Sequence, residues 1–311
     1  MKNKKVCVVG LGGVGGYLGC MLAHHYDNIY FFARGERLKS IKKDGLKLSS
    51  DAFGEFTTYP AMASNNPEEM GIMDYIILTV KNFSLEQVCD EISPMIDNHT
   101  VIIPLLNGVG VSDNIRNLID KGHVLDGLIY ITSGANEDFS IHHTSPYGIV
   151  HIGYERRNQY DENILSSVQK LLQGADITCE IESDIEAAIW TKYILNCAYN
   201  VVTAYYKATT RDLRKHKIAM MQLRSLLDEA CSVARCLKVN IPHDLEEVHF
   251  KHILQNQSES ATSSLNRDII LGRQNELETF SGQLLKSASS CGLKIPLTEF
   301  FYEKLKKVSK F

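Results

Sequence analysis

The sequence predicts an α/β domain followed by an all-helical domain, because its hydrophobic pattern changes once along the chain. Up to about residue 183, short runs of apolar residues alternate with amphipathic segments, which is typical of a parallel sheet covered on both faces. From residue 184 onward only helical periodicity is found. The chain has 311 residues, 44% of them hydrophobic, which is enough for two domains. We therefore predict domains at residues 1–183 and 184–311.

The apolar runs of the first domain predict six strands, at residues 6–9, 29–32, 75–80, 101–106, 124–131 and 148–153. Segments with helical spacing lie between them, at residues 14–25, 85–96 and 113–120. Residues 46–48 and 54–58 predict a small strand pair inserted near the third strand. In the second domain we expect six helices, at residues 184–206, 217–237, 245–255, 260–271, 276–291 and 297–308.

A glycine-rich turn follows the first predicted strand without a break. Gly10, Gly12 and Gly15 form the pattern Gly-x-Gly-x-x-Gly and lead directly into a predicted helix. In such a turn the first glycine allows the tight bend, the second lets the backbone approach a pyrophosphate, and the third lets the helix pack closely on the strand. The free N–H groups of the helix then face the phosphates. This context predicts a Rossmann-type domain that binds a dinucleotide.

Arg34 stands at the end of the second predicted strand, nineteen residues after Gly15. A site specific for NAD usually carries an acidic residue there, which binds the ribose 2′-hydroxyl. An arginine instead suits the 2′-phosphate of NADP. We therefore expect NADPH/NADP+, although Glu36 keeps NAD open and a plain surface arginine is the alternative.

Two later strand ends carry polar residues, Lys81 and Asn107. Ligands of open α/β sheets bind at the carboxyl ends of the strands, so both are candidates for contacts to the cofactor or the substrate. Each also has an ordinary interpretation, because Asn-Gly is a common turn and lysine is a common surface residue.

Lys192, Asn196 and Asn200 lie four residues apart in one of the most apolar stretches of the chain. On a helix they form one polar stripe, and a helix that is apolar nearly all round is normally buried. Buried polar groups are costly unless something polar faces them. We expect a substrate to face this stripe, while lysine snorkelling and helix–helix hydrogen bonds are the alternatives.

Composition excludes several classes of partner. The formal charge is −4 and no stretch approaches the about 18 apolar residues of a membrane span, so we expect neither nucleic acid nor membrane as a partner. The eight cysteines stand singly, which indicates reduced thiols in a cytoplasmic protein. No histidine pattern predicts a metal site. A monomer and a homodimer are both consistent with the sequence.

Taken together, these features resemble the ketopantoate reductase (2-dehydropantoate 2-reductase) family over essentially the whole chain, in order. The resemblance rests on the glycine turn, Arg34, Lys81, Asn107-Gly108, Trp190-x-Lys192-x-x-x-Asn196-Cys197-x-x-Asn200, Thr262-Ser-Ser264-Leu-Asn-Arg-Asp268, Gly272-Arg-x-x-Glu276 and Gly292-x-x-Ile-Pro296. It implies NADPH-dependent reduction of a 2-oxo acid in pantothenate biosynthesis, at a site between the two domains.

The resemblance also implies a role for each matching residue. The general acid falls on Lys192, supported by Glu276, which is also placed to contact a cofactor ribose. Substrate contacts fall on Lys192, Asn196, Asn200, Ser264 and Asn107. Cofactor contacts fall on Gly10, Leu11, Gly12, Gly13, Val14, Gly15, Arg34, Lys81 and Asn107.

The chain departs from the family pattern at Asn266, Arg267 and Thr210, all on the substrate side. A divergent paralogue that reduces another branched 2-oxo acid is therefore the main alternative to ketopantoate reduction. A non-catalytic NADP-binding sensor is a further alternative, but such a protein would need the glycine turn and not the stripe. Ser263 and Ser264 are also plausible helix caps, and Glu276 a plausible first-turn residue.

Overall fold

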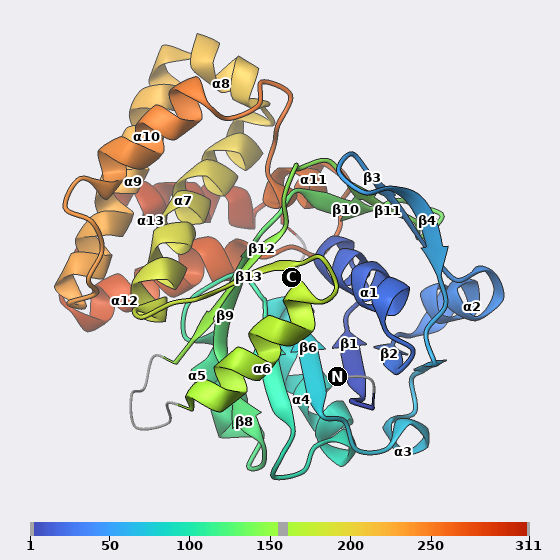
Figure 1. Ribbon diagram of the computed structural model, residues 1–311. Helices are drawn as coiled ribbons and strands as arrows, with labels where there is room; N and C mark the ends of the chain where they lie inside the picture. The colour runs from blue at the N-terminus through green and yellow to red at the C-terminus, as the bar shows by residue number, and fades with distance from the viewer. Residues whose placement is uncertain (1–2, 155–160, 310–311) are drawn as a thin grey trace. The chain divides into compact units, whose positions relative to one another are not determined.

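The computed structural model describes residues 3–154 and 161–309, and the chain divides into two compact units, Met1–Ile185 and Glu186–Phe311. The first unit is α/β and the second is helical (Figure 1). This confirms the predicted fold class of a Rossmann-type domain followed by an all-helical domain.

The first unit is built on a parallel sheet of six strands. Their order is β5 (Met62–Ser64), β2 (Ile29–Phe32), β1 (Val6–Val9), β6 (Tyr75–Leu78), β7 (Val101–Pro104) and β8 (His123–Val124). Val9 is in register with Phe32 on one side and with Leu78 on the other. The glycine turn and the ends of the neighbouring strands therefore lie together at the carboxyl-terminal end of the parallel sheet.

Every residue of β1 is buried, because successive side chains enter two different cores. Val6 and Val8 belong to the core that contains α1 (Gly13–His25) and α6 (Glu162–Gln173). Cys7 and Val9 belong to the core that contains α4 (Leu85–Ile92) and α5 (Val111–Leu118). A run that is apolar at each position is thus explained by a sheet covered on both faces.

Two smaller sheets complete the first unit. One has the order β10 (Ser133–Ala135), β11 (Ile141–His143), β3 (Leu46–Ser50) and β4 (Gly54–Thr58), and its antiparallel β3–β4 pair confirms the predicted insertion. The other has the order β13 (Thr178–Ile181), β12 (Ile149–Gly153) and β9 (Asp126–Tyr130).

The single strand predicted at residues 124–131 is wrong, because the chain changes sheets there. β8 ends at Val124 in the parallel sheet, and β9 begins at Asp126 in the three-stranded one. The buried Asp126 carboxylate accepts a 2.8 Å bond from Arg116, which anchors the chain at this crossing. One polar residue inside an apolar run thus marks the change of sheet.

The sequence also missed several elements of the first unit. The helix α2 (Gly35–Asp44) has a single buried side chain, Ile41, and so has almost no apolar face to recognise. The helix α6 was not predicted, nor were the short elements α3 (Pro67–Met70), β5, β10, β11 and β13. The helix predicted at residues 85–96 is shorter than expected, because α4 ends at Ile92 and a 3-10 turn, η2 (Ser93–Met95), follows it; another 3-10 turn, η1 (Asn82–Ser84), precedes α4.

The second unit contains long helices and shorter connecting ones (Figure 1). They are α7 (Ile185–Tyr206), α8 (Thr210–Lys215), α9 (Lys217–Cys236), α10 (Leu245–Gln255), α11 (Ser264–Ile270), the π-helical η4 (Glu278–Gly282), α12 (Gln283–Ser290) and α13 (Pro296–Lys306). The sequence missed α8. It also began the fourth helix at residue 260, whereas the backbone of 259–261 is bonded to the start of α8 and α11 begins only at Ser264.

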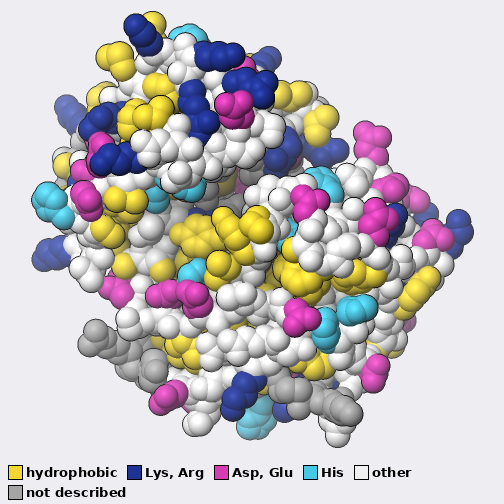
Figure 2. Space-filling view, turned by 45° about the horizontal axis from the view of Figure 1, so that its top comes forward, with side chains coloured by type: hydrophobic (Ala, Val, Ile, Leu, Met, Phe, Trp, Pro, Cys, Tyr) yellow, Lys and Arg dark blue, Asp and Glu magenta, His cyan; other side chains and the backbone are white. Residues whose placement is uncertain are grey.

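The surface agrees with the modest charge of the chain. The face shown in Figure 2 carries both basic and acidic side chains, and the basic ones gather toward the top of the view. Among the described helices, none is long and apolar enough to cross a membrane.

Candidate active-site residues

The glycine turn has the geometry that a bound pyrophosphate needs. Gly10 has φ of 92°, which favours glycine, and a Cβ on Gly15 would lie 2.1 Å from the Gly10 carbonyl oxygen. A Cβ on Gly12, by contrast, would meet nothing within 4 Å, so the backbone there borders open space. The turn is therefore tight where the helix packs on the strand, and open where a phosphate would approach.

The start of α1 leaves its N–H groups available for an anion. Gly12 is the exposed N-cap residue and provides no side-chain cap, and the first turn of α1 carries no acidic residue. Free N–H groups and the positive end of the helix dipole then face the same open space. The residues present thus fit the pyrophosphate of a dinucleotide. Leu11 can offer only its backbone to a ligand, because its side chain is buried in the core.

The carboxyl-terminal ends of the neighbouring strands β6 and β7 bring further predicted residues close to the glycine turn. The Thr79 hydroxyl donates to the Gly10 carbonyl at 2.7 Å, which fixes the end of β6 against the turn. Lys81 is half-buried and begins the turn η1. The Asn82 amide donates to the Asn107 carbonyl at 2.6 Å, which links the ends of β6 and β7. The structure thus places Lys81 and Asn107 on linked segments beside the glycine turn.

Arg34 lies at the end of β2, as the sequence predicted, but it is already engaged. Its guanidinium lies 2.6 Å from the Glu91 carboxylate of α4 and 5.9 Å from the centre of the Phe32 ring. Its side chain is 44% exposed, so an anion could still reach it. Sequence reasoning missed Glu91, which has no local signal because it stands 57 positions further along the chain.

In the second unit, the polar stripe lies on α7. Lys192 and Asn196 are half-buried and Asn200 is buried, on a helix whose other side chains are mostly buried and apolar. The Tyr193 hydroxyl donates to the Thr279 carbonyl at 2.8 Å, and a ring nitrogen of the buried His249 lies 2.9 Å from the Thr191 carbonyl. These bonds, made by the residues on either side of Lys192, fix the helix at that position.

The environment of Lys192 changes its acidity. Burial lowers the pKa of Lys192 from 10.5 to about 8, and the nearby Glu276 carboxylate partly opposes this by raising it. Glu276 itself is only 3% exposed. It directly precedes the helical run that begins at Leu277, and its backbone carbonyl accepts from the Phe280 N–H, so it stands at the N-terminus of that helix, one position before the first turn. The structure therefore brings together Lys192 and Glu276, two residues 84 positions apart.

Asn200 and the serine pair are also brought together. The Ser263 hydroxyl lies 3.4 Å from the Asn200 carbonyl and accepts a 2.7 Å bond from the Thr203 hydroxyl. Ser263 also caps α11 by accepting from the Asn266 backbone N–H. The cap is thus Ser263, whereas Ser264, the residue assigned to substrate, is the half-buried first residue of the helix. Sequence reasoning missed the positioning bonds of Thr203 and Ser263.

The residues that depart from the family pattern lie in the same unit. Thr210 is buried, its hydroxyl 2.8 Å from that of Tyr199. Asn266 is only 2% exposed and donates from its side-chain amide to the Thr262 hydroxyl at 2.8 Å. Its carbonyl oxygen is buried without a hydrogen-bond partner among the described residues. Arg267, by contrast, is exposed.

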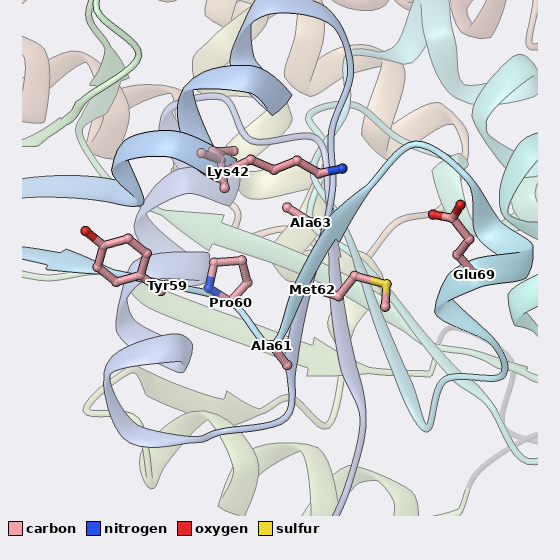
Figure 3. A pocket seen from close by; sticks show the side chains of 8 residues that line it. Lys42, Tyr59, Pro60, Ala61, Met62, Ala63 and Glu69 are labelled. Atoms are coloured by element: carbon pink, nitrogen blue, oxygen red, sulfur yellow. The ribbon is translucent and has the colours of Figure 1, made fainter.

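A separate cavity of about 370 Å³ lies at the outer edge of the parallel sheet. Lys42 and Glu69 reach it from α2 and α3, on either side of the edge strand β5 (Figure 3). None of the predicted site residues lines it, so the predicted chemistry lies elsewhere.

The chain is similar to known proteins over nearly its whole length. Residues 6–157 match the family model "Ketopantoate reductase PanE/ApbA", and residues 184–309 match the model of its C-terminal part. An uncharacterised oxidoreductase of Bacillus subtilis, YkpB, is 31% identical over 303 residues, with 97% of each chain covered. A 2-dehydropantoate 2-reductase of Nostoc is 24% identical, with 98% of this chain and 95% of that one covered.

Among solved structures, a D-mandelate dehydrogenase in a ternary complex with NADH and anilino(oxo)acetate has a TM-score of 0.88 at 19% identity. The match covers 98% of each chain. At this identity the likeness establishes a shared fold.

Proposed function

The chain belongs to the ketopantoate reductase family, a family of oxidoreductases that use a nicotinamide cofactor, and from this premise we propose that it reduces 2-dehydropantoate (ketopantoate) to pantoate with NADPH. The observation that carries the proposal is Lys192, a half-buried amine on an apolar helix, near a buried carboxylate and with a pKa lowered to about 8. A nonspecific dinucleotide-binding protein has no need of such an amine.

Lys192 is suited to act as the proton donor. The cofactor, when bound, supplies a hydride to the carbonyl carbon of the substrate, and negative charge develops on the carbonyl oxygen. An ammonium group stabilises that charge and delivers the proton. With a pKa of about 8 the amine is mostly protonated at pH 7, yet it gives up its proton more readily than an ordinary lysine. The Glu276 carboxylate keeps the pKa of Lys192 from falling further, because its negative charge favours the protonated amine.

The remaining residues of the stripe and its neighbours are assigned to the substrate. Asn196 and Asn200 lie one and two turns beyond Lys192, where their amides can donate to a carboxylate or accept from a hydroxyl. Ser264 is the third candidate, positioned by the bonds of Ser263 to α7. Asn107 of the first unit is assigned to cofactor and substrate together.

The cofactor is assigned to the first unit. Residues 10–15 bind the pyrophosphate with backbone N–H groups, Arg34 binds the 2′-phosphate of NADPH, and Lys81 and Asn107 bind nearer the nicotinamide. The open space at Gly12 and the uncapped start of α1 support this assignment.

A second candidate substrate is another branched or aromatic 2-oxo acid. The buried Thr210 and Asn266, in a unit that carries the proposed substrate residues, depart from the family pattern. The relative from Bacillus subtilis is named only as an oxidoreductase, and the D-mandelate dehydrogenase shares the fold.

The test is NADPH oxidation, followed at 340 nm, with ketopantoate and a panel of other branched and aromatic 2-oxo acids. We expect ketopantoate to have the highest kcat/KM. A higher value for another 2-oxo acid would support the paralogue. NADPH binding without turnover of any acid would refute the proposal and favour the non-catalytic sensor.

A further inference from the structure

The guanidinium of Arg34, which we assign to the 2′-phosphate of the cofactor, forms an ion pair with Glu91. Glu91 lies in the last turn of α4, and its second carboxylate oxygen accepts a 2.8 Å bond from Gln87, one turn earlier. The carboxylate is therefore fixed with one oxygen directed at Arg34, at 2.6 Å. In the part of the chain that the structure describes, Arg34 has no other ion-pair partner.

Such a pair opposes a phosphate in two ways. The guanidinium has to leave Glu91, or share itself with it, before it can bind a 2′-phosphate in the bidentate geometry that arginine favours. The negative charge of Glu91 also repels the phosphate dianion directly. Neither effect acts on NADH, because NADH carries a hydroxyl in place of the phosphate.

We propose that Glu91 determines cofactor specificity by weakening the binding of NADPH relative to NADH through its ion pair with Arg34. This inference rests on the proposed function, since it takes Arg34 as the residue that binds the phosphate. It assigns a role in specificity to Glu91, which stands 57 positions after Arg34 in the sequence and is in direct contact with it in the fold.

The test is equilibrium binding of NADPH and NADH, measured by calorimetry on the full chain and its variants. Glu91→Gln keeps the shape and the bond from Gln87, and removes the charge. We expect NADPH to bind at least about fivefold more tightly at low salt, because the repulsion of one charge on a dianion about 8 Å away in water alone gives about that factor, and release of Arg34 adds to it. NADH should change by less than about twofold, and the gain for NADPH should shrink at about 0.5 M salt.

Two further variants separate the ion pair from a general charge effect. Asp90→Asn removes an exposed carboxylate from the next position of α4, about 100° round the helix, and should leave NADPH binding unchanged. In an Arg34→Ala background, Glu91→Gln should give a smaller gain for NADPH, because the direct repulsion remains but there is no ion pair to break.

Each other outcome overturns the inference in a recognisable way. If Glu91→Gln changes the affinities for NADPH and NADH equally, or changes neither, Glu91 does not determine cofactor specificity. An equal gain from Asp90→Asn, or an undiminished gain in the Arg34→Ala background, would show that charge repulsion alone is responsible and that the ion pair has no role. If the unmodified protein binds neither nucleotide, the cofactor assignment in the proposed function fails as well, and that result is distinct from the other two.

Discussion

Replacing Lys192 by methionine should make the protein more stable and far less active. The structure gives the size of the first effect. Burial lowers the pKa of Lys192 from 10.5 to about 8, and this difference corresponds to about 3 kcal/mol by which the folded state disfavours the charged amine. Methionine keeps most of the side chain's apolar length without the charge. The gain at pH 7 is therefore at most about 3 kcal/mol, and less if Glu276 is left in an unfavourable environment.

The stability difference between Lys192→Met and the unmodified protein should decrease as the pH rises. The folded-state pKa lies below the unfolded one, so between pH 8 and 10.5 the unfolded chain binds more protons than the folded protein. The cost is fully present below about pH 8 and fades as the pH rises toward 10.5. Urea unfolding of Lys192→Met and the unmodified protein should thus differ most at pH 7 and little near pH 10.5. A difference independent of pH, or a less stable variant at pH 7, would refute the burial argument.

Measurements of turnover test the proposed role of Lys192 as the general acid. Loss of a general acid costs about 10² to 10⁴ in rate, so kcat of Lys192→Met should fall by that factor while NADPH still binds. In the unmodified protein kcat should decline as the pH rises through about 8. Glu276→Gln should move that decline to lower pH, because the carboxylate raises the pKa of Lys192. Normal turnover in Lys192→Met would remove the residue from the mechanism, whatever its stability.

Three further predictions follow from named contacts. Gly12→Ala should fold normally but lose dinucleotide binding, which NADPH titration measures. Gly15→Ala should lower the melting temperature in thermal melts, because its Cβ would lie 2.1 Å from the Gly10 carbonyl oxygen. Ser263→Ala should cost about 1 kcal/mol of stability as a lost cap, while Ser264→Ala should leave stability unchanged and raise KM. Arg116→Ala should cost about 3–5 kcal/mol in urea unfolding, because it strands a buried carboxylate.

The elements that could be predicted from the sequence are those whose local pattern has one explanation. The run at β1 is apolar at every position, and only a strand buried on both faces requires that. The helix α2 has the opposite character, since a single buried isoleucine among charged residues produces no period to detect. The break at Leu125 was missed because it depends on Arg116 bonding Asp126, a contact made only in three dimensions.

The candidate site divides in the same way. The glycine turn and the α7 stripe stand out locally, because glycine or a polar side chain interrupts a pattern that otherwise favours burial. The partners of those residues do not stand out: Glu276 near Lys192, Glu91 on Arg34 and Ser263 beside Asn200 are each more than 50 positions away. Local pattern therefore predicts the dinucleotide-binding turn and the polar stripe, and the reaction class is implied by the family resemblance that these residues carry. The cofactor preference and substrate choice that we propose depend on these distant pairs, and only the fold brings the pairs together.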